Sequence, residues 1–443
     1  MVRSRVAESR LDSQLRRALA GMPATRRYWI AYSGGRDSSV LLHAVHRFAQ
    51  SSGATVVAAH VHHGLHPQAD AWARFCRRTG RALGISLRLL RVDARPPAGE
   101  SPEDWARRCR YEALAGVLDT DDTLLTAHHR QDQAETLLLQ LMRGAGPAGL
   151  AGMPAWARFG KGWHGRPLLD CPVSWIAEYA QRHGLEWCDD QSNADRRYAR
   201  NFVRHELIPV LARRWPGFAD TIARAADWQA EAAELQGDLA AIDLAAIVTT
   251  DRAITTGGLG TLSPARQRNA VRAWVSGLRL PLPNARHVEE VIRMAAIERT
   301  DSVACVRWPG AEVRRYRDAL HAMAPLPEHD ARRTIAWNPD SAPVLPMGRL
   351  VISRRSGGVA DRVMTGKALS IRFRQGGERL LLSDGHRHSL KTLLQDRGLA
   401  PWLRRYLPLF YCGEEIAAVP GVGVNQRFRA APGEEGWGIE WRL

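Results

Sequence analysis

Short apolar segments alternate with segments of helical spacing over residues 28–142. The apolar segments have the length of strands and occupy 28–32, 55–61, 85–92 and 123–126. After each of them, apolar residues recur every three or four positions, which is typical of a helix packed on one face, over 37–50, 69–83, 103–118 and 131–142. This alternation favours βαβ units and a parallel sheet covered on both faces. We therefore predict an α/β fold with a five-stranded, doubly wound parallel sheet that binds ligands at the carboxyl ends of its strands.

The pattern changes after this region and divides the rest of the chain. Residues 144–170 are rich in Gly and Pro, and Pro216-Gly217 marks a boundary. The predicted parts are an α/β domain over 1–217, a helical module over 218–322, a proline-containing linker over 323–347 and a small α+β domain over 348–443. No apolar run approaches the roughly 18–20 residues of a membrane-spanning helix, so we expect a cytoplasmic protein with no membrane partner.

Charge and cysteine content narrow the classes of partner. Lys and Arg total 62 against 46 Asp and Glu, a net charge of +16, and all but three of the cations are Arg. A field of this sign favours a polyanion such as nucleic acid, and the forked guanidinium suits phosphate, although a GC-rich genome also raises the share of Arg. The six cysteines are scattered without the spacings of metal ribbons or thioredoxin-like sites, and we interpret them as buried thiols.

The segment after the first predicted strand has the composition of a phosphate-binding loop: Ser33-Gly34-Gly35-Arg36-Asp37-Ser38-Ser39. Adjacent glycines let backbone N–H groups turn inward, and the helix that begins there adds the positive end of its dipole. The serine hydroxyls can donate hydrogen bonds, and Asp37 can hold Mg²⁺ against phosphates. The loop is not a Walker A motif, because no Gly-Lys-Ser/Thr follows. The alternative is a turn whose Asp merely caps an ordinary helix.

The order Ser-Gly-Gly-x-Asp-Ser resembles the PP-loop of the ATP pyrophosphatases, which cleave ATP to AMP and pyrophosphate while adenylating a substrate. Further segments narrow this resemblance. They are HVHHGL at 60–65, TAHHRQDQAET at 126–136, RGAGPAGL at 143–150, RPLL at 166–169, DQSN at 190–193, RNFVR at 200–204, GGER at 376–379 and SLK at 389–391. In this order they are similar to those of the tRNA(Ile)-lysidine synthases, over about 28–217 and again in the tail.

The resemblance implies a reaction and its partners. Enzymes of this family join the ε-amino group of free L-lysine to C2 of the wobble cytidine in an isoleucine tRNA with the anticodon CAU. ATP, with Mg²⁺, first adenylates the C2 oxygen, and lysine then displaces AMP. The product, lysidine, pairs with A instead of G. The resemblance makes 1–217 the catalytic domain and 218–322 and 348–443 tRNA-binding parts, and it leaves a monomer and a homodimer both open.

For ATP, the resemblance points to the glycine-rich loop and to the end of the second predicted strand. The expected ATP-binding residues are Ser33, Gly34, Gly35, Arg36, Asp37, Ser38, Ser39, His60 and His62. A metal site at His60 and His62 is the weaker alternative, because the end of a strand beneath a nucleotide explains both residues. We interpret His128 and His129 as helix-entry or pocket-lining residues.

Two carboxylates, Asp132 and Glu135, lie three residues apart on one helical face after the fourth predicted strand. The amine of lysine has an ordinary pKa near ~10.4, so a carboxylate must bind the ammonium and later accept its proton. We expect Asp132 and Glu135 to be catalytic and to bind lysine together with Arg107. Arg110 is expected to steady the charge of the adenylate, and Asp132 to share Mg²⁺ with Asp37. Solvated surface charges are the alternative for such a pair.

One position departs from the family pattern. Many family members have two adjacent Asp residues where this chain has Gln131-Asp132, which leaves the number of metal ions open. Two alternative functions compete with lysidine synthesis. A tRNA thiolase of the same superfamily would need cysteines at defined spacing, and a paralogue that binds tRNA without turnover would draw its support from Gln131.

RNA recognition is expected from cations near the catalytic domain and in the tail. Arginines contact RNA phosphates, and a wobble base must leave its stack to reach an active site. The expected tRNA-binding residues are Arg143, Arg200, Arg204, Arg387, Lys391 and Arg404.

Overall fold

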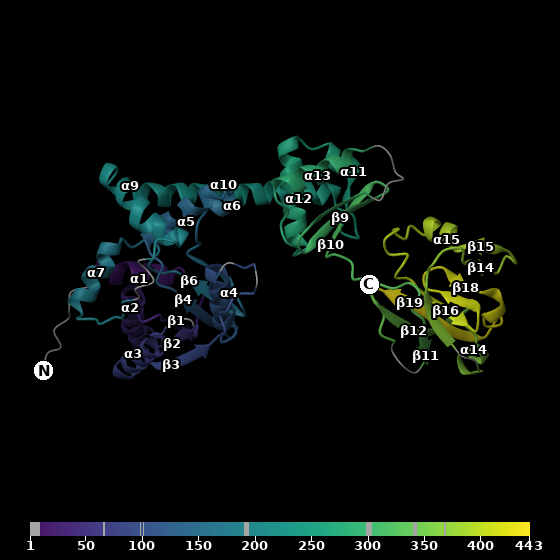
Figure 1. Ribbon diagram of the computed structural model, residues 1–443, viewed down its shortest axis with the longest axis horizontal. Helices are drawn as coiled ribbons and strands as arrows, with labels where there is room; N and C mark the ends of the chain where they lie inside the picture. The colour runs from purple at the N-terminus through teal and green to yellow at the C-terminus, as the bar shows by residue number, and fades with distance from the viewer. Residues whose placement is uncertain are drawn as a thin grey trace. The chain divides into compact units, whose positions relative to one another are not determined.

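The computed structural model describes residues 9–64, 67–97, 99–100, 102–189, 195–297, 304–339, 343–366 and 369–443. Its contacts divide the chain into two units, one up to Leu235 and one from Gln236 onward. The division falls inside α10 (Phe218–Ile247), a helix of 30 residues (Figure 1). Over the described residues, no helix is long and apolar enough to cross a membrane.

A six-stranded sheet with the order β3-β2-β1-β4-β6-β5 forms the centre of the first unit (Figure 1). Its strands are β1 (Arg27–Ala31), β2 (Thr55–His62), β3 (Ser86–Arg91), β4 (Asp122–Leu125), β5 (Trp156–Phe159) and β6 (Gly162–Gly165). All but β5 run parallel, which confirms the predicted five-stranded parallel sheet, and β5 adds an antiparallel edge. The sequence pattern did not reveal β5 and β6, because each has four residues and lies in the stretch rich in Gly and Pro.

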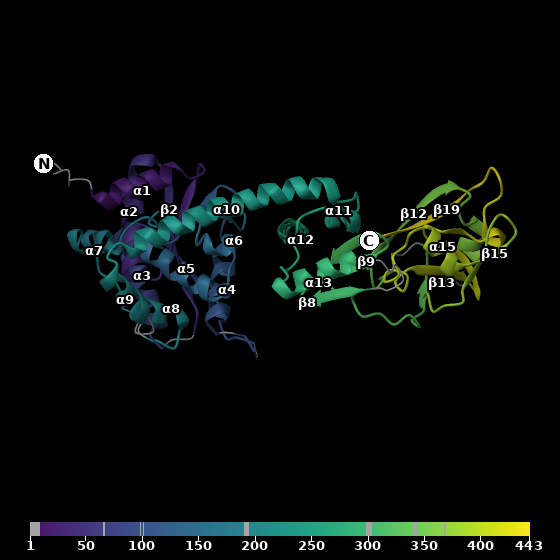
Figure 2. The same cartoon turned by 90° about the horizontal axis from the view of Figure 1, so that it is seen from above.

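Helices cover both faces of this sheet, as predicted. The helices of this part of the chain are α1 (Arg10–Ala20), α2 (Arg36–Ser52), α3 (Ala69–Ala82), α4 (Pro102–Ala115), α5 (Arg130–Met142), α6 (Pro147–Leu150) and α7 (Val173–Arg182). Side chains of a strand point alternately to its two faces. Accordingly, Tyr28 and Ile30 of β1 belong to a core with residues of α1, α2 and α7, whereas Trp29 packs with Leu114 of α4. In both views α1 and α2 lie side by side (Figures 1 and 2).

The first unit continues after α7 into a helix with a wide turn in its middle. Its parts are α8 (Ala199–Phe202), a π-helical turn (Val203–Leu207) and α9 (Ile208–Arg214). Single π-turns inside α-helices are frequent at functional sites, and this one contains Arg204.

The second unit begins with helices packed on a small antiparallel sheet. The helices are α11 (Thr256–Gly260), α12 (Pro264–Gly277) and α13 (Ala285–Ala296), and the sheet order β7-β10-β9-β8 contains β7 (Ile254–Thr255), β8 (Cys305–Trp308), β9 (Ala311–Tyr316) and β10 (Ala319–Met323). Trp274, Val291 and Val313 join helices and sheet in one core. The helices of the predicted module are present. The sheet was not predicted, because its strands are too short to give a clear sequence pattern.

The remainder of the second unit is the predicted α+β part. Its elements are β11 (Ile335–Trp337), β12 (Arg349–Ser356), α14 (Asp361–Gly366), β13 (Leu369–Phe373), β14 (Arg379–Leu381), β15 (Arg387–Ser389), α15 (Leu390–Asp396), β16 (Pro408–Cys412), β17 (Glu415–Val419), β18 (Gly423–Val424) and β19 (Glu435–Arg442). Five strands form the antiparallel sheet β11-β13-β16-β17-β18, and β12 pairs with β19 (Figure 2). Strand β11 lies within the stretch 323–347 that the sequence indicated as a linker.

We predict that a methyl group at Gly162 destabilises the first unit. A Cβ atom there would overlap the backbone oxygen of Asp122 and lie 2.9 Å from that of Asp119, so β6 could not keep its place beside β4. Such overpacking should lower the free energy of unfolding by about 1–3 kcal/mol in urea titrations of Gly162→Ala.

The matched control is Gly237→Ala in α10, where a Cβ atom would meet nothing within 4 Å. This change should raise the free energy of unfolding by about 0.5–1 kcal/mol, because Ala favours a helix over Gly. If Gly162→Ala were as stable as the wild-type protein, the close contact between β4 and β6 would be wrong.

Candidate active site

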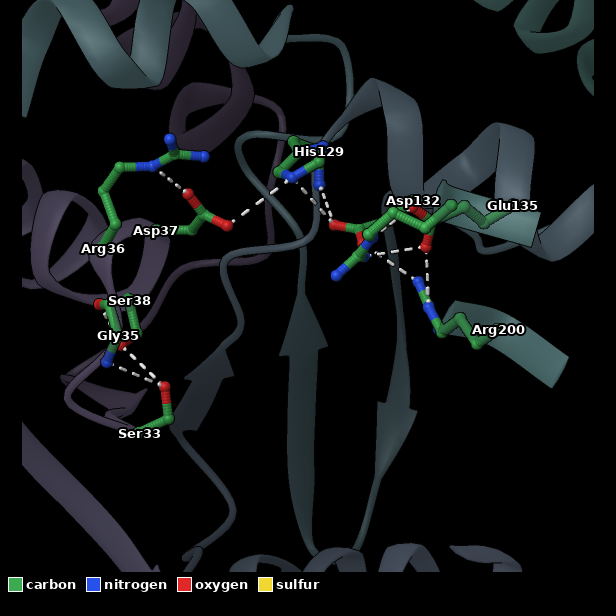
Figure 3. Close-up of polar contacts among 10 residues, drawn as sticks. Ser33, Gly35, Arg36, Asp37, Ser38, His129, Asp132, Glu135 and Arg200 are labelled. Atoms are coloured by element: carbon green, nitrogen blue, oxygen red, sulfur yellow. Dashed lines mark hydrogen bonds and ion pairs between the residues drawn. The ribbon is translucent and has the colours of Figure 1, made fainter. Parts of the chain in front are cut away.

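The loop between β1 and α2 is held in shape by its own serines and glycines (Figure 3). Gly35 caps α2, and its backbone N–H donates to Ser33 Oγ at 3.3 Å. The Ser38 hydroxyl donates to the backbone oxygen of Gly35 at 2.9 Å, and the hydroxyl oxygens of Ser33 and Ser38 lie 3.0 Å apart. The unpaired N–H groups and the dipole of this 17-residue helix therefore make the loop a site for an anion.

Gly34 is required by the space around the loop. Its φ of +90° lies in the region that favours glycine, and a Cβ atom would lie 3.1 Å from Cys76 Sγ. The backbone oxygen of Gly34 accepts a hydrogen bond from the N–H of Cys188 at 2.9 Å. The loop is thus fixed on both sides by side chains and backbone of other elements.

A cavity of about 450 Å³ lies beside this loop. It is bordered by the carboxyl ends of β1, β2 and β4, which is the edge of the sheet where the sequence predicted ligand binding. Ser33, Asp37 and Ser38 line it from the loop, and Arg110 lines it from α4. The volume falls within the roughly 300–1,000 Å³ of small-molecule sites.

His60 and His62 end β2 and line the same cavity. His60 Nδ1 lies 2.9 Å from the backbone oxygen of Tyr32, which can only accept, so Nδ1 carries the proton. Burial lowers the pKa of His60. His62 Nε2 lies 3.1 Å from Asp70 Oδ1. Each imidazole has one nitrogen occupied by the protein, which orients the ring toward a ligand.

His129 joins two acidic residues from separate helices (Figure 3). Its Nε2 lies 3.6 Å from Asp37 Oδ2 and 3.5 Å from Asp132 Oδ2. Asp132 also accepts a hydrogen bond of 2.9 Å from the backbone N–H of His129, the residue that caps α5. Burial would raise the pKa of each carboxyl group, but His129 and the nearby arginines hold the pKa of both Asp37 and Asp132 below its usual range. Both carboxylates are therefore ionised at neutral pH.

Glu135 is completely buried and is paired with two arginines from the helix after α7. Arg200 donates to Glu135 at 2.8 Å and to Asp132 at 3.0 Å. Arg204 donates to Glu135 at 2.6 Å and 2.8 Å, and to Asp132 at 3.0 Å. A buried carboxylate is costly unless it is paired and hydrogen-bonded, so these arginines make the position of Glu135 possible. Figure 3 shows Arg200 beside Glu135 and Asp132.

Three family models match separate stretches of the chain. They describe a PP-loop domain over residues 7–211, a TilS substrate binding domain over 256–321 and a TilS substrate C-terminal domain over 369–441. The tRNA(Ile)-lysidine synthase of Alkalilimnicola ehrlichii is 42% identical over 429 residues, 95% of each chain, and that of Methylococcus capsulatus is 39% identical over 95% of this chain and 98% of its own. The chain belongs to the tRNA(Ile)-lysidine synthase family.

A solved structure is more distantly similar. The U34-tRNA thiolase NcsA from Methanococcus maripaludis, with its [4Fe-4S] cluster, aligns with a TM-score of 0.42 and 17% identity over 50% of this chain and 78% of that one. Membership of the lysidine synthase family confirms the resemblance found in the sequence, and the PP-loop domain implies ATP binding.

Asp37 and Asp132 fit a magnesium site in which the two carboxylates supply part of the coordination shell and the substrate supplies the rest. Mg²⁺ is usually held by one or two carboxylates together with phosphates and water. Asp37 and Asp132 both approach His129 Nε2, and both are ionised. Within the described part of the chain, no group of three or more His, Cys, Asp or Glu side chains is arranged to hold a metal. Gln131 lies beside Asp132 at the start of α5 and cannot add a carboxylate.

Arg107 and Arg110 lie on α4 next to Tyr111. The guanidinium of Arg107 lies 4.9 Å from the centre of the Tyr111 ring and that of Arg110 lies 5.5 Å from it. Arg110 lines the cavity, whereas Arg107 is exposed and is not among the lining residues. The structure thus brings Arg110, but not Arg107, to the wall of the site.

The expected tRNA-binding residues lie in both units. Arg143 is exposed at the end of α5, and Arg200 and Arg204 are turned toward the buried carboxylates. In the second unit, Arg387 and Lys391 are exposed on β15 and α15. Arg404 is half-buried, and its guanidinium donates a hydrogen bond of 2.8 Å to a backbone oxygen.

Sequence reasoning did not identify the contacts that organise these acids. It placed His129 at the entry of a helix, and the structure adds that the ring bridges Asp37 and Asp132. It assigned Arg200 and Arg204 to RNA binding. The two residues are four positions apart and so lie on one helical face, and this spacing was the available signal for a shared acidic partner. The segment 190–193 lies outside the described residues.

We predict that His129→Gln costs more stability in mild acid than in mild alkali. Burial alone would lower the pKa of His129, but its contact with Asp37 and the charges of Asp132 and Glu135 raise it. A group with a raised pKa contributes stability that is complete below its unfolded-state pKa of ~6.5 and is lost as the pH rises through its folded-state pKa.

The measurement is the difference in Tm between wild type and His129→Gln at pH 6 and pH 9, with magnesium chelated. The difference should be larger at pH 6. An equal difference at both values would mean that His129 carries no charge in the folded protein.

Proposed function

We propose that this chain joins the ε-amino group of free L-lysine to C2 of the wobble cytidine in tRNA(Ile) with the anticodon CAU. The C2 oxygen first attacks the α-phosphate of ATP, and pyrophosphate leaves. The amine of lysine then attacks C2, and AMP leaves with the former C2 oxygen. The product, lysidine, pairs with A instead of G and changes the codon that is read from AUG to AUA.

The observation that carries this proposal is the match to curated tRNA(Ile)-lysidine synthases over 95% of the chain. The site supports it in two respects. The PP-loop borders a cavity of suitable volume, and ionised carboxylates lie at the loop and at the start of α5. An oxygen on a pyrimidine ring is a poor leaving group, and transfer of AMP to it is the chemistry that a PP-loop provides.

Residues 33–39 would bind the phosphates of ATP, with His60 and His62 beside the nucleotide. Mg²⁺, when bound by Asp37 and Asp132, would neutralise charge as pyrophosphate leaves. Arg110 lines the cavity and would stabilise the negative charge of the adenylate.

Asp132 and Glu135 would bind the lysine ammonium, and Asp132 is the better placed to accept its proton. One oxygen of Asp132 faces His129 and Asp37, and the other faces Arg200 and Arg204. Both oxygens of Glu135 are held by these arginines, so Glu135 would reach lysine only after one of them moves. Phosphates of the bound tRNA are suitable competing partners for Arg200 and Arg204.

Lysine labelled with a radioisotope tests the function directly. The protein, ATP, Mg²⁺ and a transcript of tRNA(Ile) with the anticodon CAU should give acid-stable label in the RNA. The label should depend on ATP and disappear when the wobble C is replaced by U. Tight tRNA binding without label would favour the binding paralogue, and incorporation of sulfur instead of lysine would favour the thiolase.

We predict that Asp132→Asn lowers the rate of lysine transfer by about 10²–10³-fold at saturating tRNA, because a general base contributes gains of this order. Asp121→Asn is the control: Asp121 is exposed and precedes β4 at the opposite edge of the sheet. The control should retain the wild-type rate, and tRNA affinity should stay the same in both variants. A wild-type rate for Asp132→Asn would remove this residue from the proposed chemistry.

A further inference from the structure

A chain of four side chains leads from Arg166 to the wall of the cavity. The Arg166 guanidinium lies 3.2 Å from His164 Nδ1, and His164 Nε2 lies 2.9 Å from Thr126 Oγ1. Thr126 Oγ1 lies 2.8 Å from His128 Nδ1. Thr126 and His164 meet because they lie at the carboxyl ends of the neighbouring parallel strands β4 and β6. This row of hydrogen-bonded side chains is separate from the charged group of Asp37, His129 and Asp132 and from the PP-loop.

The donor and acceptor atoms of these four side chains set a direction for their hydrogen bonds. A guanidinium can only donate, so His164 Nδ1 accepts and its Nε2 carries the proton. That proton is donated to Thr126 Oγ1. Over the described residues Thr126 Oγ1 has no third partner, so its own hydroxyl proton is donated to His128 Nδ1. The proton of the neutral His128 ring is therefore on Nε2.

Both imidazoles stay neutral over the physiological range. Burial, followed by the charge of Arg166, lowers the pKa of His164 to about 3. Burial is also the largest cause at His128, and with Arg166 and Arg200 it lowers the pKa of His128 to about 3 against the opposing charge of Asp132. The direction of the hydrogen bonds is consequently the same from mild acid to mild alkali.

The Nε2–H group of His128 is available to a ligand. His128 lines the cavity together with Ser33, Asp37, Ser38 and Arg110. Within the described part of the chain its Nδ1 is bonded to Thr126 and its Nε2 has no hydrogen-bonding partner. His128 is half-buried, and an N–H donor that lines the cavity beside a phosphate loop without a protein acceptor points to an acceptor supplied by substrate.

We propose that His128 donates a hydrogen bond from Nε2 to an oxygen of the α-phosphate, first in ATP and then in the adenylate, and that Arg166, His164 and Thr126 are positioning residues that fix its tautomer. This inference rests on the proposed function. No proton is transferred: the imidazole is a fixed neutral donor, whereas Arg110 and Mg²⁺ provide the positive charge. A preorganised donor of this kind acts on charge that develops in the transition state.

Substitution of His128 gives the kinetic test. His128→Ala should lower kcat for lysidine formation by about 10²-fold or more while the KM values for ATP and lysine change by less than about threefold. His128→Gln should recover most of the rate, because the amide nitrogen of Gln can occupy the place of Nε2. His46→Gln, on α2 away from the loop, is the matched control and should behave as wild type. A wild-type kcat for His128→Ala overturns the inference.

The tautomer is tested separately, on the free protein and without any assay of activity. Long-range ¹H–¹⁵N correlation spectra of protein labelled with ¹⁵N-histidine should show His128 protonated at Nε2, with the signal assigned by its loss in His128→Gln. Thr126→Ser, which keeps the hydroxyl, should preserve this state, and Thr126→Val should populate the other tautomer and lower kcat. Protonation at Nδ1 in the wild-type protein, or an unchanged spectrum in Thr126→Val, overturns the positioning roles.

The two tests separate this inference from the function on which it rests. If the wild-type protein forms no lysidine, the proposed function fails whatever the spectra show. If lysidine forms and His128→Ala is as fast as wild type, the role of His128 alone fails. Melting temperatures of all variants distinguish loss of the donor from loss of the fold.

Discussion

A carboxylate with no exposed surface sets the arrangement of the candidate active site. Glu135 lies inside the protein and needs compensating cations, which Arg200 and Arg204 provide from a segment about 65 residues further along the chain. The same arginines donate to Asp132, so they join the start of α5 to the helix that follows α7. The orientation of Asp132 toward His129 and Asp37 depends on this pairing.

Two polar networks of different character meet at the cavity. On one side, Asp37, His129 and Asp132 form a charged group, which in the proposed reaction would hold Mg²⁺ and receive the lysine ammonium. On the other side, Arg166, His164, Thr126 and His128 are joined by hydrogen bonds that are donated in one direction, and both imidazoles are neutral. The proposed reaction has two successive steps at one base and would use both networks, because charge would be exchanged with the substrates while the phosphate stays in place.

The sequence was sufficient for the parts of the fold that have strong local patterns. The first four parallel strands, the PP-loop and the helix with Asp132 and Glu135 follow from hydrophobic spacing and from glycine and serine at defined positions. Strands β5 and β6 did not, because four residues with two glycines in β6 give no alternation. The pairing of Arg200 with Glu135 and the bond between Thr126 and His164 arise from tertiary contacts, which a single sequence does not record.

In the proposed reaction, adenylation of the C2 oxygen precedes the attack of lysine, and one measurement separates the two steps. Protein, Mg²⁺, the tRNA transcript and ATP labelled at the α-phosphate are mixed without lysine, quenched and separated on a denaturing gel. If adenylation comes first, label should appear on the RNA and should be released as AMP when lysine is added. Formation of lysidine without label ever appearing on the RNA, or transfer of the label to lysine instead, would contradict it.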